Sequence, residues 1–183
     1  MSIIKFNYLK GFARAYPIFI PFFSFFYGII FQNKLSTYFS LLLIVVDVIL
    51  TTSLKSLSRN VYKYFNINSI PIIGIGKRPS GAMYCGCFVD ENEIGKLSTS
   101  FGLPSGHSMS AMTICIFWTR YIIDNYPNSP RRNLSLFSLF SISLFILFSR
   151  IWLNCHTIQQ VIIGGLIGSF VGYYGYEYRN YFK

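Results

Sequence analysis

The sequence is poor in charged residues, and acidic residues are the scarcest of them. Asp, Glu, Lys and Arg make up 12% of the 183 residues, against 52% hydrophobic residues, which leaves too little polar surface for a soluble domain. Six acidic residues face 16 Lys and Arg, so the formal net charge is +10. In a soluble protein this excess would suggest nucleic acid, but here the basic residues are scattered between apolar runs. We therefore expect no nucleic-acid partner and interpret these residues as loop charges beside lipid headgroups and as phosphate ligands.

Cysteine is also scarce, and the four cysteines form no recognisable framework. Cys85 and Cys87 are too close for an easy disulfide, and Cys155 beside His156 lacks the spacing of zinc ligands. The acidic run at residues 90–93 lacks the turn glycine of a calcium loop, so we interpret it as a solvated surface. The sequence predicts free thiols, no metal site and no cofactor.

Hydrophobic residues gather in five segments, each somewhat short or interrupted relative to the roughly 20 residues that a membrane span requires. The segments cover approximately residues 16–31, 38–54, 107–123, 134–148 and 158–176. No small-residue cleavage pattern follows the first segment, which we expect to be retained. A further apolar piece at 69–76 is too short to span, and we expect it to be re-entrant or a packed cap. The sequence predicts an all-α fold: a polytopic membrane bundle of about five transmembrane helices, forming one domain over residues 1–183.

Three features within the segments carry structural predictions. Gly164, Gly168 and Gly172 recur every fourth residue and predict a stripe on one helix face that packs within the bundle. Arg120 is expected to reach the membrane interface opposite His107. Asp47 lies inside the second segment, where a carboxylate suggests a function. The alternative is a neutral or hydrogen-bonded structural role, because no motif includes Asp47.

Both histidines of the chain lie in motifs suited to phosphate chemistry. His107 ends the run Pro104-Ser105-Gly106-His107, and His156 follows Ser149-Arg150 after five residues, with Gln160 four residues further on. Upstream stands Arg78-Pro79. This order of three motifs resembles that of the type 2 phosphatidic acid phosphatase superfamily. If all five segments span, the loops that hold the motifs lie on the same side of the membrane, so the motifs can meet.

Each motif residue can be given a role. Arg78 and Arg150 offer planar forks of donors to phosphate oxygens. Ser105 can donate its hydroxyl, and Gly106 permits close approach of the backbone to the phosphoryl group.

The resemblance implies the roles of the two histidines. His156 would attack phosphorus to form a phosphohistidine, and His107 would act as the general acid. Water would then hydrolyse the intermediate, and no metal would be required.

The chain departs from the superfamily pattern at Gln160, where an Asp commonly stands. The carbonyl oxygen of Gln160 can accept the Nδ1–H of His156 and fix its tautomer, and we expect an Asp to be tolerated there. The Gln pattern is similar to that of dolichyl-diphosphate phosphatases and glucose-6-phosphatases.

A second departure concerns the lysine that usually stands six residues before Arg-Pro. This chain has Pro71 where that spacing places the lysine. Lys55, at the end of the second helix, and Lys77, beside Arg78, are both candidates to replace it, with a slight preference for Lys55.

The architecture favours a lipid substrate, because a small bundle has no sizeable soluble domain to bind a sugar. A polyprenyl diphosphate such as dolichyl diphosphate is the first expectation, followed by phosphatidate or another lipid phosphate, and then glucose 6-phosphate. A catalytically silent membrane protein that binds lipid phosphates is the alternative of another class. Analogy with the Gln-bearing relatives suggests the endoplasmic reticulum with a lumenal site, although the loop charges do not decide the sidedness.

Overall fold

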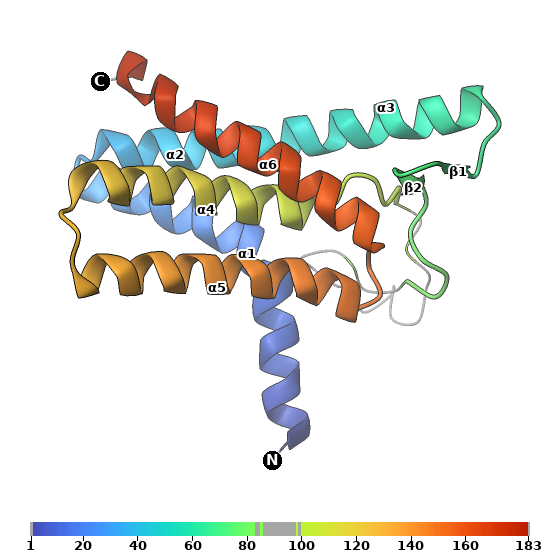
Figure 1. Cartoon of the computed structure of the whole chain (residues 1–183), viewed down its shortest axis with the longest axis horizontal. Coiled ribbons are helices and arrows are strands. Elements are labelled where there is room, and N and C mark those ends of the chain that lie inside the picture. Colours follow the sequence, from blue (N-terminus) through green and yellow to red (C-terminus); the bar gives the residue numbers. More distant parts are fainter. Residues whose placement is uncertain (1, 83–84, 86–97, 99, 183) are drawn as a thin grey trace.

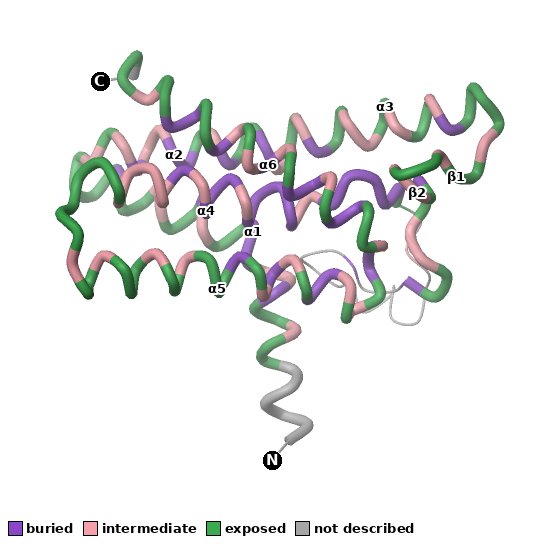
Figure 2. Tube along the Cα trace, in the orientation of Figure 1, coloured by how far each residue is buried: buried purple, intermediate pink, exposed green. Residues whose placement is uncertain are grey.

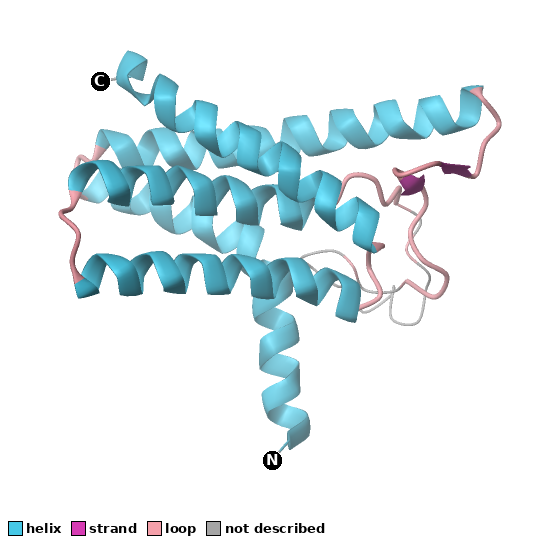
Figure 3. Ribbon diagram, in the orientation of Figure 1, coloured by secondary structure: helices cyan, strands magenta, loops and turns pink. Residues whose placement is uncertain are grey.

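Most of the computed structural model, which describes residues 2–82, 85, 98 and 100–182, is helical (Figures 1 and 3). The α-helices are α1 (Ser2–Ile30), α2 (Lys34–Ile44), α3 (Thr51–Tyr64), α4 (Gly106–Asn125), α5 (Pro130–Trp152) and α6 (Ile158–Tyr178). A π-helical segment, η1 (Val45–Leu50), joins α2 to α3, and a short 3-10 helix, η3 (Arg179–Phe182), follows α6. Because α2, η1 and α3 are continuous, the described residues form five helical rods. The prediction of a helical membrane protein is confirmed.

Within the part of the chain that the structure describes, three rods are long and apolar enough to cross a membrane. They are Tyr8–Ile30, Lys34–Tyr64 and Pro130–Trp152. The other two rods, α4 and α6, are 20 and 21 residues long and pack against each other within the bundle. Most of the α4 stretch from Ser108 to Phe117 is buried (Figure 2). The bundle is therefore built around α4 and α6.

Local sequence signals define where the helices begin. Asn33 caps α2 by accepting a hydrogen bond from the backbone of Ser36 at 3.0 Å. Ser129 caps α5 in the same way, and Pro130 occupies the first turn, where a missing N–H has no cost. The first helix contains Pro17 and Pro21, and its N-terminal part projects away from the bundle (Figure 1).

The predicted glycine stripe of α6 packs directly on the backbone of α4. A Cβ atom placed at Gly164, Gly168 or Gly172 would come closer than 3.0 Å to the α4 backbone or its N-cap. The backbone atoms met there belong to Ser105, Met109 and Thr113 respectively. Thr113 also donates a hydrogen bond across the contact to the carbonyl of Gly168 at 3.1 Å. The packing prediction is confirmed.

The long connection between α3 and α4 carries a small cap over one end of the bundle. Strands β1 (Ser69–Ile70) and β2 (Gly74–Ile75) form an antiparallel pair, with Ser69 opposite Ile75. Beneath them, Tyr62, Phe101 and Leu103 form a buried cluster. Of the two expectations for residues 69–76, the packed cap is correct.

The prediction of free thiols is wrong for two of the four cysteines. Cys85 and Cys155 form a disulfide across a sequence separation of 70 residues. Local spacing carried no sign of it, because only the folded connection brings Cys85 to the turn between α5 and α6. Cys115 is free and buried. Cys87 and the acidic run at 90–93 lie outside the described residues.

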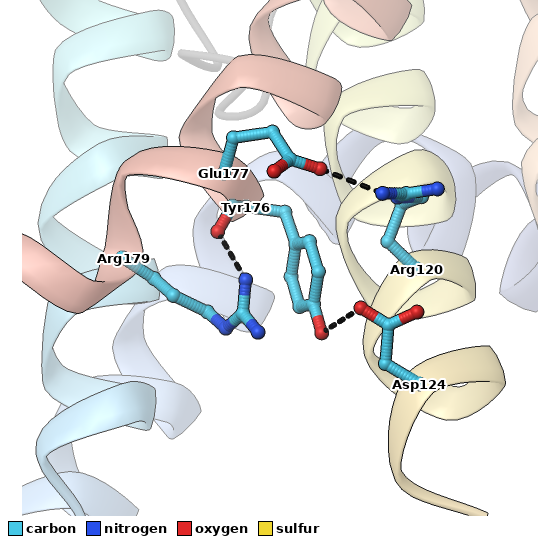
Figure 4. A network of polar contacts seen from close by, with 5 residues as sticks. All are labelled: Arg120, Asp124, Tyr176, Glu177 and Arg179. Atoms are coloured by element: carbon cyan, nitrogen blue, oxygen red, sulfur yellow. Dashed lines mark hydrogen bonds and ion pairs between the residues drawn. The ribbon is translucent and has the colours of Figure 1, made fainter.

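A polar network joins α4 and α6 at the other end of the bundle (Figure 4). Arg120 pairs with Glu177 at 2.7 Å, and the hydroxyl of Tyr176 donates to Asp124 at 2.7 Å. Arg179 lies over the Tyr176 ring, 3.5 Å from its centroid. As expected, Arg120 lies far from His107, which opens the same helix.

We predict that Gly168→Ala lowers the melting temperature by several degrees, because the added methyl group would overlap the α4 backbone. Overpacking of this kind costs roughly 1 to 3 kcal/mol. The measurement is thermal unfolding of the purified protein in detergent.

Gly11→Ala is the matched control, since a Cβ at Gly11 meets nothing within 4 Å. It should leave the melting temperature unchanged or raise it slightly. Equal melting temperatures for the two variants would contradict the close contact of α4 with α6.

Candidate active site

The three motifs meet at the end of the bundle that carries the cap. A cavity of about 620 Å³ opens there. Its polar end is lined by the two histidines and by Lys55, Arg78, Ser100, Thr51 and Gly106. The structure thus brings together residues that lie as far apart in the sequence as Lys55 and His156.

A tight turn between α5 and α6 presents His156 to the cavity. The backbone N–H groups of Cys155 and His156 both donate to the carbonyl of Arg150, at 3.0 and 3.1 Å. Asn154 adopts a positive φ of 54°, a conformation that Asn tolerates, and its side chain donates to the carbonyl of Ser80 at 2.9 Å. His156 therefore stands directly before the N-terminus of α6, where the helix dipole favours a bound anion.

The amide of Gln160 holds the ring of His156. Its Nε2 donates to the carbonyls of Ile75 and Lys77, at 2.8 and 2.7 Å, so its oxygen must be the atom that faces His156. That oxygen accepts from Nδ1 of His156 at 3.1 Å. The proton is thereby fixed on Nδ1, and the lone pair lies on Nε2. The geometry supports the predicted role of Gln160 as the group that orients the ring.

Burial and nearby cations keep His156 neutral. Burial lowers the pKa of His156 well below its usual value, and the charges of Arg78, Arg150 and Lys55 lower it further, against a smaller opposing effect of Gln160. The imidazole of His156 therefore remains unprotonated at neutral pH and takes up a proton only in more acidic solution. A neutral ring with its lone pair on Nε2 is the form that can act as a nucleophile.

Arg78 is fixed beside His156 by three hydrogen bonds to two acceptors. Its Nε and Nη2 donate to the hydroxyl of Ser100 at 2.9 and 2.8 Å, and its Nη1 donates to the carbonyl of Cys155 at 2.9 Å. Nη1 also lies 3.1 Å from Nε2 of His156. Burial lowers the pKa of Arg78 to about 10, so the side chain remains charged at neutral pH. Sequence reasoning missed Ser100, because no motif or spacing marks it.

Two predicted phosphate ligands lie behind the cavity wall. Arg150 and Ser105 are both fully buried, and neither is among the residues that line the cavity in the described chain. The Nη2 of Arg150 donates to the carbonyl of Cys85 at 2.8 Å. Ser105 accepts from the hydroxyl of Ser108 at 2.9 Å, and its backbone N–H donates to the carbonyl of Gln160 at 3.1 Å. In this arrangement Ser105 connects two motifs instead of facing a ligand.

His107 lines the cavity and is held by the first helix. Its Nε2–H donates to the backbone carbonyl of Arg14 at 3.0 Å, which leaves Nδ1 for other contacts. Beside it, Gly106 makes its close approach to α3, since a Cβ at Gly106 would lie 2.9 Å from the Thr51 methyl carbon. The predicted contact of Gly106 with a phosphoryl group is compatible with its place in the cavity wall.

The two candidate lysines occupy different environments. Lys55 lines the cavity and contributes to the electrostatic lowering of the His156 pKa. Lys77 has an exposed side chain, and its contribution to the site is the backbone carbonyl that accepts from Gln160. The geometry therefore favours Lys55 as the phosphate ligand.

The cavity continues from its polar end into an apolar groove between α1 and the rod formed by α2 and η1. The groove is lined by Pro17, Ile18, Pro21, Phe22, Phe25, Ser40, Ile44 and Val48. Asp47 lies in the wall at the same level and accepts a hydrogen bond from Ser110 of α4. Among the described residues, no group of three His, Cys, Asp or Glu side chains is placed to hold a metal ion.

The fold and the cavity together define a helical membrane protein with a cationic, histidine-containing pocket that opens into an apolar groove. The model of the PAP2 superfamily matches residues 38–183, and the chain belongs to this superfamily. Its members are phosphatases, so membership implies phosphatase activity on lipid-like substrates. No curated protein and no solved structure shows a significant match to the chain.

We predict that Gln160→Ala slows turnover of a lipid phosphate by about 10- to 100-fold, because the His156 ring loses the group that orients it. Gln160→Asp should be impaired as well. An Asp is shorter than Gln and would place a carboxylate near the carbonyls of Ile75 and Lys77, to which it cannot donate. This geometry argues against the expectation that an Asp is tolerated.

The control is Gln159→Ala, which removes an exposed amide from the preceding position. Its turnover number should match that of the wild type. Unchanged turnover in Gln160→Ala would show that another group orients the ring.

Proposed function

We propose that the protein removes phosphate from a lipid phosphate or diphosphate in the membrane, through a phosphohistidine at His156 and without a metal ion. The preferred substrate in this proposal is a polyprenyl diphosphate. The observation that supports it is the continuity of the cavity from the two histidines, Arg78 and Lys55 to the apolar groove along α1. A lipid with one chain can keep that chain in the groove while its headgroup enters the polar end.

The first step transfers the phosphoryl group to the enzyme. The Nε2 lone pair of His156 attacks the terminal phosphorus, and the bond from phosphorus to the bridging oxygen breaks. In this mechanism the negative charge of the bound phosphate keeps His107 protonated on both ring nitrogens. His107 donates the Nδ1 proton to that oxygen while its Nε2–H stays on the Arg14 carbonyl, and a polyprenyl monophosphate leaves. Arg78 and Lys55 neutralise the charge on the phosphoryl oxygens, which requires Nη1 of Arg78 to exchange its contact with His156 for one with the substrate.

The second step releases inorganic phosphate. His107, now neutral, accepts a proton from a water molecule that attacks the phosphorus of the phosphohistidine, and the bond from nitrogen to phosphorus breaks. Gln160 keeps the His156 ring in place throughout, because its contact is with Nδ1 and not with the reacting nitrogen. The enzyme returns to its starting protonation state.

The disulfide supports a site that faces an oxidising compartment. Cys85 lines the cavity and Cys155 precedes His156, and disulfides persist chiefly on the lumenal or extracellular side of membranes. A lumenal site in the endoplasmic reticulum is consistent with this placement.

We predict that a labelled lipid diphosphate, quenched rapidly, leaves acid-labile and base-stable label on the wild type and none on His156→Ala. The label is the phosphohistidine that the mechanism requires. EDTA should leave turnover unchanged, because the residues of the pocket supply the charge stabilisation. Near-normal turnover in His156→Ala would eliminate the nucleophile, and loss of turnover in EDTA with recovery on adding a divalent ion would eliminate the metal-free mechanism.

We further predict that Lys55→Ala lowers kcat/KM by roughly 10- to 150-fold, because the phosphate loses one charge-assisted contact, worth about 1.5 to 3 kcal/mol. Lys77→Ala is the matched control and should have a smaller effect, since its side chain is exposed. Arg150→Ala should cause a severe loss of kcat/KM. An equal loss in the two lysine variants would contradict the assignment of Lys55.

The same assays should be run on a polyprenyl diphosphate, phosphatidate and glucose 6-phosphate, with kcat/KM highest for the polyprenyl diphosphate. A higher value for phosphatidate would replace the proposed substrate with a lipid monophosphate. If the wild type binds these lipids but releases no phosphate, and His107→Ala and His156→Ala bind them equally well, the protein is a silent binder.

A further inference from the structure

The two arginines of the motifs are held by the two halves of one disulfide. Nη1 of Arg78 donates to the carbonyl of Cys155 at 2.9 Å, and Nη2 of Arg150 donates to the carbonyl of Cys85 at 2.8 Å. We propose that the Cys85–Cys155 disulfide is a positioning element for catalysis, which fixes both guanidinium groups relative to His156. The inference rests on the proposed function and adds a redox requirement to it.

The covalent bond joins the connection between α3 and α4 to the turn between α5 and α6. Cys155 is fully buried and Cys85 is 4% exposed, and they form a small cluster with Ala82 and Leu153. Arg150 also contacts the segment of Cys85 through the hydrogen bond to its carbonyl. The disulfide therefore determines where this carbonyl stands with respect to the turn that carries His156.

The position of this carbonyl matters because Arg150 is buried. Burial of a guanidinium costs free energy unless its donors are hydrogen-bonded. If the acceptors of Arg150 move, its side chain must therefore move with them or bond to other acceptors. The backbone carbonyl of the same residue holds the N–H groups of Cys155 and His156, so any shift of Arg150 reaches the nucleophile. On the other side, Arg78 shares Nη1 between Cys155 and His156.

Reduction of the bond has a defined chemistry. A dithiol attacks one sulfur as a thiolate and forms a mixed disulfide, and its second thiol then closes to a cyclic disulfide. Two electrons and two protons pass to Cys85 and Cys155, which become free thiols. In the opposite direction, a protein disulfide of the compartment accepts the two electrons.

Removal of the disulfide can be tested in the 183-residue chain with Cys85→Ala, Cys155→Ala and the double variant. Removal of either cysteine eliminates the whole covalent bond, so each single variant should lose as much activity as the double variant. We expect a loss of about 10-fold or more in the rate of His156 phosphorylation. Vanadate, an analogue of phosphate, should bind more weakly by a similar factor, as measured by thermal shift.

If the disulfide only stabilised the fold, its removal would lower the melting temperature without changing the phosphorylation rate or the vanadate affinity. The pH profile of phosphorylation is a third measurement that separates the two roles. The charges of Arg78 and Arg150 lower the pKa of His156, as does that of Lys55, which the disulfide does not hold. Displacement of the two arginines should therefore raise this pKa and move the acid limb of the phosphorylation rate to higher pH. Cys115→Ala, which removes a buried free thiol, is the control and should leave the limb in place.

Reversibility completes the test. Treatment with a dithiol should lower the phosphorylation rate and the vanadate affinity of the wild type to those of the double variant. Reoxidation should restore both quantities, and the double variant should not respond to either treatment. If the double variant retains the wild-type vanadate affinity, phosphorylation rate and pH profile, the disulfide has no positioning role. Vanadate binding is independent of turnover. If the wild type hydrolyses none of the lipids, the proposed function is rejected, and the vanadate affinities of the wild type and the double variant still decide the role of the disulfide.

Discussion

The amide of Gln160 is the point at which the separate parts of the site are joined. Its oxygen holds the ring of His156, its nitrogen holds the carbonyls of Ile75 and Lys77, and its backbone carbonyl accepts from Ser105. Each of these contacts reaches a different motif. The side-chain amide can make the contacts with His156, Ile75 and Lys77 because it offers an acceptor and two donors on one rigid group, whereas a carboxylate offers acceptors alone. The presence of Gln at this position is thus tied to the path of the chain before Arg78.

The contact between α4 and α6 makes that junction possible. The glycine stripe brings the two backbones together along the length of the pair, so the start of α6 lies against the N-cap of α4. The two histidines stand at these two helix starts. Their relative position is therefore determined by backbone packing, which is more rigid than contact between long side chains. The polar network of Arg120, Asp124, Tyr176 and Glu177 closes the other end of the same pair.

The sequence predicted the five rods, the glycine stripe and the meeting of the motifs, because each depends on periodicity or on the side of the membrane that a loop occupies. The disulfide could not be predicted, since its two cysteines are 70 residues apart and no local spacing relates them. For the same reason, the contact of Ser100 with Arg78 and that of the Arg14 carbonyl with His107 were not found. The burial of Ser105 and Arg150 depends on packing, which a motif does not encode. The structure favoured one of the two lysines only because it shows which side chain reaches the cavity.

The first helix has a different relation to the site from the rest of the bundle. It lies outside residues 38–183, which match the superfamily, yet Pro17, Pro21 and Phe22 form one wall of the groove and the Arg14 carbonyl holds His107. The motifs and the α1 wall of the groove thus belong to separable parts of the protein, while the opposite wall, formed by α2 and η1, lies within the matched residues. Mutations in α1 can change the fit of the hydrophobic chain while every motif residue stays the same. In this architecture, relatives with identical motifs can differ in the lipids they accept, and the residues of the first helix would determine that difference.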